Sequence, residues 1–406
     1  MTTTRRLTII ADDLTGAADT AAPFALAGLA TAIVLDPEAS PGAEVLVVTT
    51  NSRDLPEEAA VQATRHALHR WVTSEPGWVY RKIDSALRGH LRAEVETTMQ
   101  VLGLGKALVA PALPHQGRTT INGRQHLNGA PLEETSFGAL GVESNLFAIF
   151  DPDRTGRATS LPLQTVRQGP ASIRRVLDSQ STGIIIADAE TTTDLDNLAA
   201  AIVSSDLKLL AGTAGLARSL ATTLANSSRT ANLRPAPDGA ILVVAGSREA
   251  ATASQVDYLR ANGVPVTHLT TDHLESPALM QAEIITPLTN LLAAGTSVAL
   301  TTVGLQSAHH QPATIRQQLA AIVTTLHEIR PLGGLVLTGG DVAIGILQAL
   351  RVTHIDLGGE VQPAIPWGVA HLPDGTPIPV ATKAGSFGHE DALSACLHHL
   401  DRKLSP

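Results

Sequence analysis

The stretch TIIADDLTGAADTAAPFALAG, residues 8–28, places two acidic side chains between a short apolar run and an alanine-rich segment. The apolar run predicts a buried strand and the alanine-rich segment predicts a helix, so the aspartates lie in the turn between them. One interpretation is that Asp13 or Thr15 caps the helix, because such side chains accept hydrogen bonds from the first free N–H groups. The other is a ligand site, because ligands of open α/β sheets bind beyond the carboxyl ends of the strands.

The same strand–turn–helix pattern recurs along the chain. Apolar runs occur at RLTIIA, LATAIVLD, EVLVVTT, GWVYRKI, ALVAPAL and TGIIIAD, with helix-like segments between several of them. A second series begins at AILVVAGSREAATASQVDYLRANG, after a small, polar and proline-containing stretch at residues 224–240. This alternation is typical of βαβ units. The sequence therefore predicts two α/β domains, residues 1–237 and 238–406, each a largely parallel sheet flanked by helices, with a ligand cleft between them.

Composition narrows the classes of protein to which the chain can belong. Its 406 residues include 38 acidic and 29 basic side chains, a formal net charge of −9, with no long run of either sign. This predicts neither a nucleic-acid partner nor a membrane-surface partner. No apolar stretch reaches the ~18 residues of a membrane-spanning helix, and MTTTRRLTII lacks the apolar core of a secretion signal. Because Cys396 is the single cysteine, no disulfide can form within the chain. We expect a cytoplasmic protein.

Charged side chains follow three of the predicted strands. Asp12 and Asp13 follow the first strand, Arg53 follows EVLVVTT, and residues 82–85 follow GWVY. Parallel strands end at one edge of a sheet, so we expect these groups to lie close together. Arginine and lysine there suit a carboxylate-bearing or phosphorylated ligand, which arginine can bind through two parallel hydrogen bonds. Arg88, in KIDSALRGH, is either a solvated helix residue or a part of the same site.

Residues 112–137 are rich in Gly, Asn, Pro and Thr, which predicts a long loop with a functional or interface role. Arg118, His126 and Asn128 are polar groups of this segment with no obvious partner in the sequence. An ordinary surface hairpin is the alternative interpretation. As an interface, the loop could serve a homodimer.

Three glycine-containing turns follow apolar runs in the second half of the chain, at VVAGSREA, VLTGGDVA and TKAGSFGHED. Glycine lets the backbone approach a ligand closely, and a following helix N-terminus presents free N–H groups to phosphate oxygens. Together the turns predict a nucleotide or phosphate site. The chain contains neither G-x-x-x-x-G-K-[ST] nor G-x-G-x-x-G, and it lacks the protein-kinase signatures, H-E-x-x-H and G-x-S-x-G. The common nucleotide-binding fingerprints are therefore excluded.

These motifs, taken in order, resemble one known family. The stretches are IADDLTGAADT, TTNSRDL, RKIDSALRGH, PALPHQGRTT with HLNGAPLEET, AGTAGLA, VVAGS, VLTGGD and KAGSFGHEDAL. They resemble the four-carbon acid sugar kinases, which include kinases for D-threonate, D-erythronate and 3-oxo-tetronates. The resemblance covers nearly the whole chain. It implies that the N-terminal domain binds a sugar acid and that the C-terminal domain binds ATP.

The resemblance also implies positions for the contacts. The implied substrate-binding residues are Asp12, Asp13, Arg53, Lys82, Ile83, Asp84 and Ser85, with Arg88 as a further candidate. The implied ATP-binding residues are Ser247, Gly339, Gly340, Asp341, Val342 and Gly385. An aspartate would accept the proton of the attacked hydroxyl, with Asp13 as our first choice and Asp84 as the second. Mg²⁺ is expected at the phosphates, although no metal-ligand motif identifies its ligands.

Three positions depart from the family pattern. Members commonly have Thr at Ala86, Asn at His90, and Thr at Val342, so two hydroxyl groups are missing beside the predicted sites. Two alternatives therefore remain open. One is a sugar-acid or nucleotide binding protein of the same fold that lacks catalysis. The other is a dehydrogenase of hydroxy acids, which the missing G-x-G-x-x-G argues against.

Overall fold

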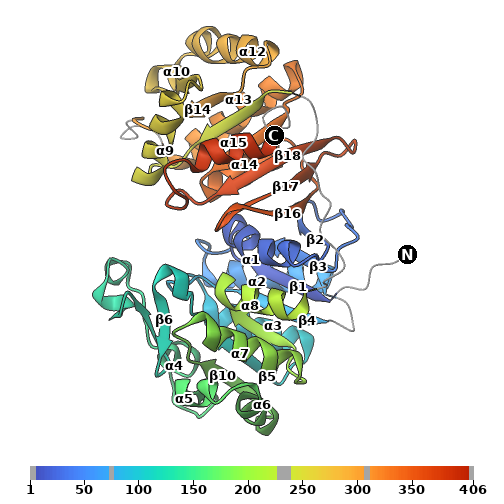
Figure 1. Cartoon of the computed structure of the whole chain (residues 1–406), viewed down its shortest axis with the longest axis vertical. Helices are drawn as coiled ribbons and strands as arrows, with labels where there is room; N and C mark the ends of the chain where they lie inside the picture. Colours follow the sequence, from blue (N-terminus) through green and yellow to red (C-terminus); the bar gives the residue numbers. More distant parts are fainter. Residues whose placement is uncertain (1–5, 73–76, 226–238, 306–310, 402–406) are drawn as a thin grey trace. The chain divides into compact units, whose positions relative to one another are not determined.

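The computed structural model describes residues 6–72, 77–225, 239–305 and 311–401. The chain divides into two compact units: unit 1 comprises residues 1–32 and 42–230, and unit 2 comprises residues 33–41 and 231–406. The predicted boundary near residue 237 lies outside the described residues. Each unit has a mostly parallel sheet flanked by helices (Figure 1), so the predicted α/β fold class is confirmed.

Unit 1 contains a sheet with the strand order β2-β3-β1-β4-β11-β5-β10-β9, and the pairings from β3 to β9 are parallel. Its strands are β1 Leu7–Ala11, β3 Val45–Thr49, β4 Trp78–Lys82, β5 Lys106–Ala110, β9 Ala158–Leu161, β10 Gly183–Ala187 and β11 Leu209–Gly212, and β2 Thr31–Val34 has residues 31 and 32 in unit 1 and residues 33 and 34 in unit 2. Its helices are α1 Leu14–Leu26, α2 Glu57–Trp71, α3 Leu91–Leu102, α4 Leu146–Phe150, α5 Leu163–Arg167, α6 Pro170–Ser179, α7 Thr192–Val203 and α8 Ala214–Leu224.

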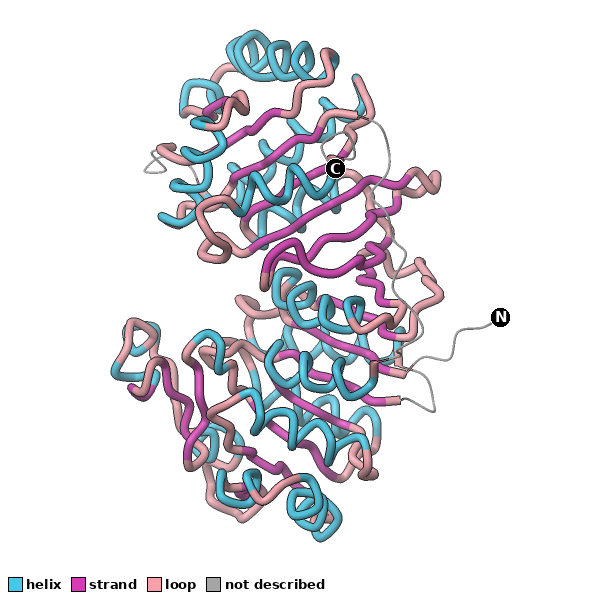
Figure 2. Tube along the Cα trace, in the orientation of Figure 1, coloured by secondary structure: helices cyan, strands magenta, loops and turns pink. Residues whose placement is uncertain are grey.

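The apolar runs of the sequence form the buried strands of this sheet. Every residue of β1, LTIIA, is buried, as is every residue of β10, GIIIA. Strands of a parallel sheet are covered on both faces, which explains why they are continuous apolar runs. Helix α1 packs against α8 and α8 against α7, whereas α2 packs against α3. Figure 2 shows these helices around the strands of the sheet.

Residues 112–137 form a small sheet where the sequence predicted a long loop. Strands β6 Arg118–Ile121, β7 Arg124–Leu127 and β8 Ala130–Pro131 pair antiparallel in the order β6-β7-β8, with 3-10 helices at Pro114–Gln116, Leu132–Glu134 and Gly138–Leu140. Both turns are Asn-Gly pairs with positive φ, 52° and 69° at residues 122 and 123, and 51° and 87° at residues 128 and 129. Asn-Gly is the strongest short-range signal for such tight hairpins. The segment therefore forms a hairpin sheet and not an irregular loop.

Unit 2 contains a sheet with the order β13-β14-β12-β15-β18-β17-β16. Its strands are β12 Ile241–Ala245, β13 Val266–His268, β14 Val298–Thr301, β15 Gly334–Thr338, β16 His354–Gln362, β17 Ile365–His371 and β18 Pro377–Lys383. Its helices are α9 Ala250–Ala261, α10 Thr271–Glu275, α11 Pro277–Leu279, a π-helix at Met280–Ile285, α12 Thr286–Ala293, α13 Pro312–Ile329, α14 Gly340–Ala349 and α15 Ala392–Leu400. None of the helices described in either unit is long and apolar enough to cross a membrane.

The parallel part of this sheet ends at β18. Strand β18 pairs in parallel with β15, but β17 pairs antiparallel with both β18 and β16. Residues of β16 alternate between buried and half-buried along its first half, which is typical of an antiparallel strand with one covered face. Trp367 of β17 and Cys396 of α15 belong to the apolar core of the unit. The helix α15 thus covers strands of both the parallel and the antiparallel part.

Candidate functional site

The sheet of unit 1 brings the predicted charged residues to one edge. Strand β1 pairs in parallel with both β3 and β4, and its last residue, Ala11, lies opposite Thr49 and Lys82. The residues that follow the three strands therefore leave the sheet side by side. Asp12 and Asp13 follow β1, Arg53 lies in the loop after β3, and Asp84 follows β4.

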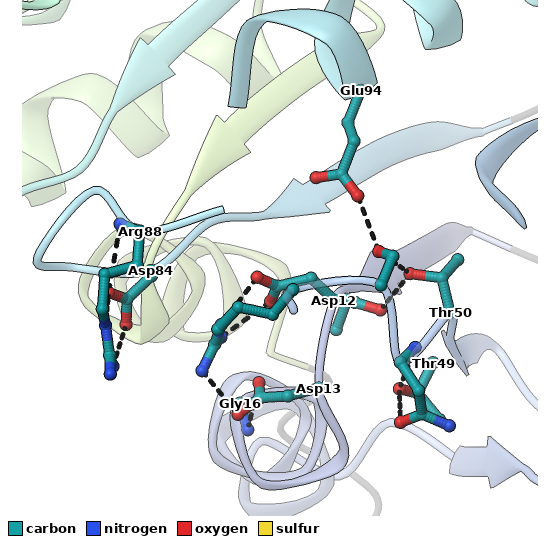
Figure 3. A network of polar contacts seen from close by, with 12 residues as sticks. Asp12, Asp13, Gly16, Thr49, Thr50, Asp84, Arg88 and Glu94 are labelled. Carbon is teal, nitrogen blue, oxygen red and sulfur yellow. Dashed lines mark hydrogen bonds and ion pairs between the residues drawn. The ribbon is translucent and has the colours of Figure 1, made fainter. Parts of the chain in front are cut away.

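Arg53 binds both aspartates of the first turn. Its Nε donates to Asp12 Oδ2 at 2.8 Å, one terminal nitrogen donates to Asp12 Oδ1 at 2.8 Å, and the other donates to Asp13 Oδ2 at 2.9 Å. Figure 3 shows these hydrogen bonds around Asp12 and Asp13. The guanidinium that the sequence assigned to the substrate thus faces the two carboxylates in this structure. We name Asp12, Asp13 and Arg53 the Asp–Arg cluster.

Asp12 is the buried member of the cluster, with 4% of its side chain exposed. Burial alone would raise the pKa of Asp12, but the hydrogen bonds from Arg53 and the nearby charge of Lys82 outweigh it and lower this pKa. Burial alone would lower the pKa of Arg53, but Asp12 and Asp13 outweigh it, so this pKa is raised. Gly89 approaches closely, because a Cβ there would lie 3.3 Å from Asp12 Oδ2. The pair of Asp12 and Arg53 therefore stays charged and fixed.

Asp13 is both a helix cap and the most exposed carboxylate of the cluster. It is the N-cap of α1, and its Oδ1 accepts a hydrogen bond of 3.0 Å from the backbone N–H of Gly16. Its side chain is 30% exposed, compared with 4% for Asp12. Capping is thus one function of Asp13, but each carboxylate oxygen accepts only one of the hydrogen bonds described here. Each oxygen retains a lone pair that a ligand hydroxyl can use.

Lys82, the last residue of β4, places a buried ammonium beside this turn. The residue is 6% exposed, and no hydrogen bond or ion pair reaches its side chain from the residues that the structure describes. Its Nζ lies next to Gly16, where an added Cβ would lie 2.7 Å from Nζ and 2.3 Å from Asp13 Oδ1. Buried ammonium groups are normally paired. Lys82 therefore provides a positive charge near Asp12 and Asp84 with donors still available for a ligand, at the N-terminus of α1, where the helix also favours anions.

The loop after β4 carries a second ion pair. Arg88 donates to Asp84 through Nε at 2.7 Å and through a terminal nitrogen at 3.1 Å (Figure 3). Burial would raise the pKa of Asp84, but Arg88 and the charges of Arg53 and Lys82 lower it. Arg88 precedes α3, so it is not a helix residue, and its side chain is 44% exposed. Both oxygens of Asp84 are thus occupied by a guanidinium that remains accessible.

The two other predicted residues of this loop are held through the backbone. Ile83 is buried, and its N–H donates to the carbonyl of Gly212 at 2.9 Å. The carbonyl of Ser85 accepts a hydrogen bond of 3.0 Å from the side chain of Gln125. Ile83 therefore contributes to the site by positioning Lys82 and Asp84, and Ser85 ties the loop to strand β7.

The small sheet contributes an arginine that the sequence left without a partner. Arg118 and Arg88 each lie 6.0 Å from the ring of Phe137. Burial lowers the pKa of Arg118, and Asp84 and Arg88 are its nearby charges. Its Nε is buried without a hydrogen-bond partner among the described residues. The β6–β8 sheet thus places a second guanidinium near the Asp84–Arg88 pair.

A buried network lies behind the Asp–Arg cluster. Glu94 of α3 pairs with Arg81 of β4 and accepts a hydrogen bond of 2.7 Å from Ser52 Oγ. Ser52 in turn shares a hydrogen bond of 2.7 Å with Thr50, and its N–H donates to the carbonyl of Asp12 at 3.0 Å. Figure 3 shows Glu94 and Thr50 as parts of the polar network that includes Asp12. The network fixes the loop that carries Arg53, a function that the sequence analysis did not identify.

The three glycine turns of unit 2 converge on one another. We use this name for residues 246–248, 339–342 and 384–385, which follow β12, β15 and β18. A Cβ on Gly246 would lie 2.7 Å from Val342, and one on Gly385 would lie 1.9 Å from Ser247 Oγ. Gly339 has a φ of +91°, in the region that favours glycine, and it precedes the first residue of α14. Close backbone packing therefore explains why the sequence has glycine at each turn.

Two of the glycine turns line a cavity of about 200 Å³. The residues that line it are Gly246, Arg248, Thr302, Leu305, Pro312, Ile315, Arg316, Gly339, Gly340, Asp341 and Val342. Two arginines and the N-terminus of α14 give this cavity a positive character, which suits phosphate oxygens. Val342 is buried against Gly246, so the position at which the resemblance implies a hydroxyl is part of the packing here.

Lys383 is a buried cation beneath the glycine turns that the sequence analysis missed. It is 1% exposed, and its Nζ donates to the carbonyl of Gly385 at 3.2 Å and to Thr252 Oγ1 at 3.5 Å. Burial lowers the pKa of Lys383 to about 8. In the sequence, a lysine at the end of an apolar run does not indicate whether its side chain is buried. Its location identifies it as a positive charge that supports the turn at Gly385.

Comparisons with known proteins agree with this division into two sites. The family model described as the sugar-binding N-terminal domain matches residues 7–220, and the nucleotide-binding C-terminal domain matches residues 242–393. A D-threonate kinase of Salmonella typhimurium is 32% identical over 98% of both chains. A D-threonate kinase of Cupriavidus necator is 35% identical over 95% of both. A D-erythronate kinase of Heliobacterium modesticaldum is 29% identical over 98% of this chain and 97% of its own.

A solved structure has the same fold. The crystal structure of a protein from Haemophilus influenzae matches this chain with a TM-score of 0.79 and 22% sequence identity. The match covers 97% of this chain and 100% of the other. It extends the agreement in architecture to nearly the full length of both proteins.

Proposed function

We propose, from the premise that the chain belongs to the four-carbon acid sugar kinase family, that it transfers the γ-phosphoryl group of ATP to a hydroxyl of a small sugar acid. The acid is of the threonate, erythronate or 3-oxo-tetronate type. One observation carries this proposal beyond the family. A partly exposed carboxylate, Asp13, and an unpaired buried ammonium, Lys82, lie together at the edge of the sugar-binding unit.

Asp13 is the proposed general base. The attacked hydroxyl must lose a proton during phosphoryl transfer, and a positioned carboxylate can accept it. Asp12 and Asp84 are poorer candidates, because guanidinium groups occupy both oxygens of each and lower both pKa values. Asp13 accepts one hydrogen bond per oxygen and is the most exposed of the three. Asp84, the second choice from sequence, is better suited to holding Arg88 in place.

The proposed partner of the substrate carboxylate is Lys82, with Arg88 and Arg118 as further donors. Lys82 is a buried residue whose ammonium makes no hydrogen bond in the described part of the chain, so its donors are available to a bound carboxylate. The guanidinium of Arg88 is partly exposed while it holds Asp84. Arg118 has a buried Nε–H that donates to no partner among the described residues. Arg53 acts indirectly, because it holds Asp13 in the orientation that the base requires.

The glycine turns of unit 2 are the proposed ATP-phosphate site. The free N–H groups at the start of α14 and the side chains of Arg248 and Arg316 suit the phosphate oxygens. The cavity of about 200 Å³ is smaller than the roughly 300–1,000 Å³ of ordinary ligand pockets, so it would hold part of the nucleotide. Mg²⁺ would neutralise phosphate charge, and Asp341, an exposed carboxylate at this cavity, fits a direct or water-mediated ligand.

The test is an ADP-release assay with Mg·ATP and a panel of D-threonate, D-erythronate and 3-oxo-tetronates. We expect release that depends on one of these acids and that is lost in Asp13→Asn. Thermal stabilisation by a sugar acid without ADP release would instead support the non-catalytic binding protein. A change in nicotinamide absorbance with a hydroxy acid would support the dehydrogenase. Either result would overturn the proposed reaction.

A further inference from the structure

Two histidines and an aspartate gather on strands β16 and β17 of unit 2. His354 and Asp356 are two residues apart on β16, so their side chains lie on the same face of the strand. His371, the last residue of β17, is the direct cross-strand partner of His354. All three side chains are partly exposed.

The donor atoms of the three side chains converge. His371 Nε2 lies 3.0 Å from Asp356 Oδ2, and His354 Nε2 lies 4.0 Å from the same oxygen. The imidazole rings are stacked, with centroids 4.4 Å apart and an angle of 8° between their planes. One donor atom from each residue can be chosen so that all three lie within 4.8 Å of one another. Small side-chain rotations would bring all three within the ~2.0–2.2 Å bond lengths of one ion.

A further hydrogen bond orients His354 toward this centre. Its Nδ1 lies 3.0 Å from Thr353 Oγ1, so its Nε2 is the nitrogen that remains for a ligand. Metal-binding histidines commonly have such a partner on the second ring nitrogen, which fixes the ring. A plain histidine–aspartate pair would explain the contact between His371 and Asp356. It would not explain why a second imidazole, held by its own hydrogen bond, turns Nε2 to the same oxygen.

We infer that His354, Asp356 and His371 bind one divalent transition-metal ion, with water completing its coordination. Two imidazoles and a carboxylate suit Zn²⁺, Co²⁺ or Ni²⁺, whereas Mg²⁺ prefers oxygen ligands. The site is therefore chemically distinct from any Mg²⁺ that accompanies ATP. It would tie β16 to β17 across their shared end, so binding should stabilise the antiparallel part of unit 2.

The cluster lies at the opposite end of the strands from the glycine turns. His371 pairs with Pro377, the first residue of β18, whereas Gly385 follows the last residue, Lys383. The seven residues of β18 span roughly 20 Å at the usual rise per residue. The proposed ion is thus too distant to contact a phosphate at the turns, and the inference does not depend on the proposed kinase reaction.

The test uses the full chain after treatment with a chelator, titrated with Zn²⁺ by calorimetry and with Co²⁺ by visible absorption. We expect one ion per chain and a Co²⁺ spectrum typical of nitrogen ligation. His354→Ala, His371→Ala and the isosteric Asp356→Asn should each weaken binding at least ~10–100-fold, the loss seen when even outer partners of a metal site are removed. Circular dichroism of each variant establishes that the fold is kept.

His66→Ala is the matched control, because His66 is an exposed histidine on helix α2 of the other unit. This variant should bind Zn²⁺ as the unaltered protein does. Zn²⁺ should also raise the melting temperature of the unaltered protein and of His66→Ala, but not that of His371→Ala. Absence of stoichiometric binding, or equal binding by all the folded variants, would overturn the inference.

Discussion

The two units position charged and phosphate-binding groups by different means. At the edge of unit 1, opposite charges hold one another, with Arg53 between Asp12 and Asp13 and with Arg88 on Asp84. At the edge of unit 2, the bare backbone of glycine packs against neighbouring side chains, and a Cβ on Gly246 or Gly385 would collide with Val342 or Ser247. The first edge should therefore be sensitive to loss of charge, and the second to added volume.

The two buried lysines show the same difference. Each is the last residue of its strand, Lys82 of β4 and Lys383 of β18. Lys82 lacks a hydrogen-bond partner among the described residues and lies near carboxylates, which suits a ligand-binding group. Lys383 donates to Gly385 and Thr252, and burial lowers its pKa to about 8. The same residue type at the same strand position is thus the proposed ligand-binding group in one unit and supports a turn in the other.

The largest expected effect is on turnover in Asp13→Asn. Asparagine is also a good helix N-cap and can still accept from Gly16, so α1 should form as before. It cannot accept the proton, so kcat should fall by ~10²–10⁴ with little change in KM for the sugar acid. Steady-state kinetics measures both constants. Asp54→Asn, an exposed neighbour of Arg53, is the control and should keep the original kcat. Intact turnover with weaker substrate binding in Asp13→Asn would show that Asp13 is not the base.

The next effect is on stability in Arg53→Met. This change leaves the buried carboxylate of Asp12 without its main partner, which should lower the free energy of unfolding by roughly 3–5 kcal/mol. Arg167→Met is the matched control, because Arg167 also spans two carboxylates, Glu190 and Asp194, but is 49% exposed. The control should lower the free energy of unfolding far less, because water screens the charge of the exposed Arg167. Chemical denaturation of both variants gives the comparison, and equal losses would contradict the view that burial makes the Asp–Arg cluster rigid.

A smaller effect should follow from added volume in Gly385→Ala. The new Cβ would meet Ser247 Oγ and Glu249, so the turns must shift at a cost of about 1–3 kcal/mol. Because the shifted turns would no longer match the phosphates, we expect ATP affinity to fall roughly 10–100-fold, as measured by calorimetry with Mg·ATP. Gly263→Ala, with a φ of +83° and no neighbour within 4 Å, should lower stability but leave ATP affinity unchanged. Unchanged affinity in Gly385→Ala would separate this turn from the nucleotide.

The last expected effect builds up gradually with pH and concerns the pH dependence of stability through Lys383. Its pKa is about 8 in the folded chain and near the ordinary 10.5 when unfolded, so the unfolded state binds more protons between these values. The free energy of unfolding relative to Lys383→Met should therefore rise from pH 8 toward pH 10.5, by at most ~1.4 kcal/mol per pH unit. Denaturation curves across this range measure the difference. Lys208→Met, which removes an exposed lysine, should show no such trend; a flat difference for Lys383→Met would mean that Lys383 is not a buried cation.

Much of the fold was predictable because the information is local. Runs such as LTIIA and GIIIA are mostly apolar and are buried at every position, as expected for a strand covered on both faces. The hairpin of β16 and β17 was missed because HIDLGGEVQ mixes glycine and charge with a weak alternation. The β6–β8 sheet had a clear signal in its two Asn-Gly turns, which the overall polar composition of the segment obscured.

The sequence predicted which residues lie at the site better than it predicted which of them form ion pairs. Parallel strand ends dictate that Asp12, Arg53 and Lys82 meet at one edge, whatever their partners. Which cation faces which carboxylate depends on loop geometry after the strands, and Arg53 binds the aspartates instead of standing free. Lys383 was missed because its importance comes from burial under Gly385, a long-range feature that no short motif encodes.

The most direct test of the central claim follows the γ-phosphoryl group itself. Phosphorus NMR of the protein with Mg·ATP and each four-carbon acid distinguishes a phosphate ester of the acid from free phosphate. We predict that an ester signal grows in step with ADP for at least one acid, and that neither signal grows in Asp13→Asn. ADP accompanied by inorganic phosphate and no ester, for every acid of the panel, would contradict the account.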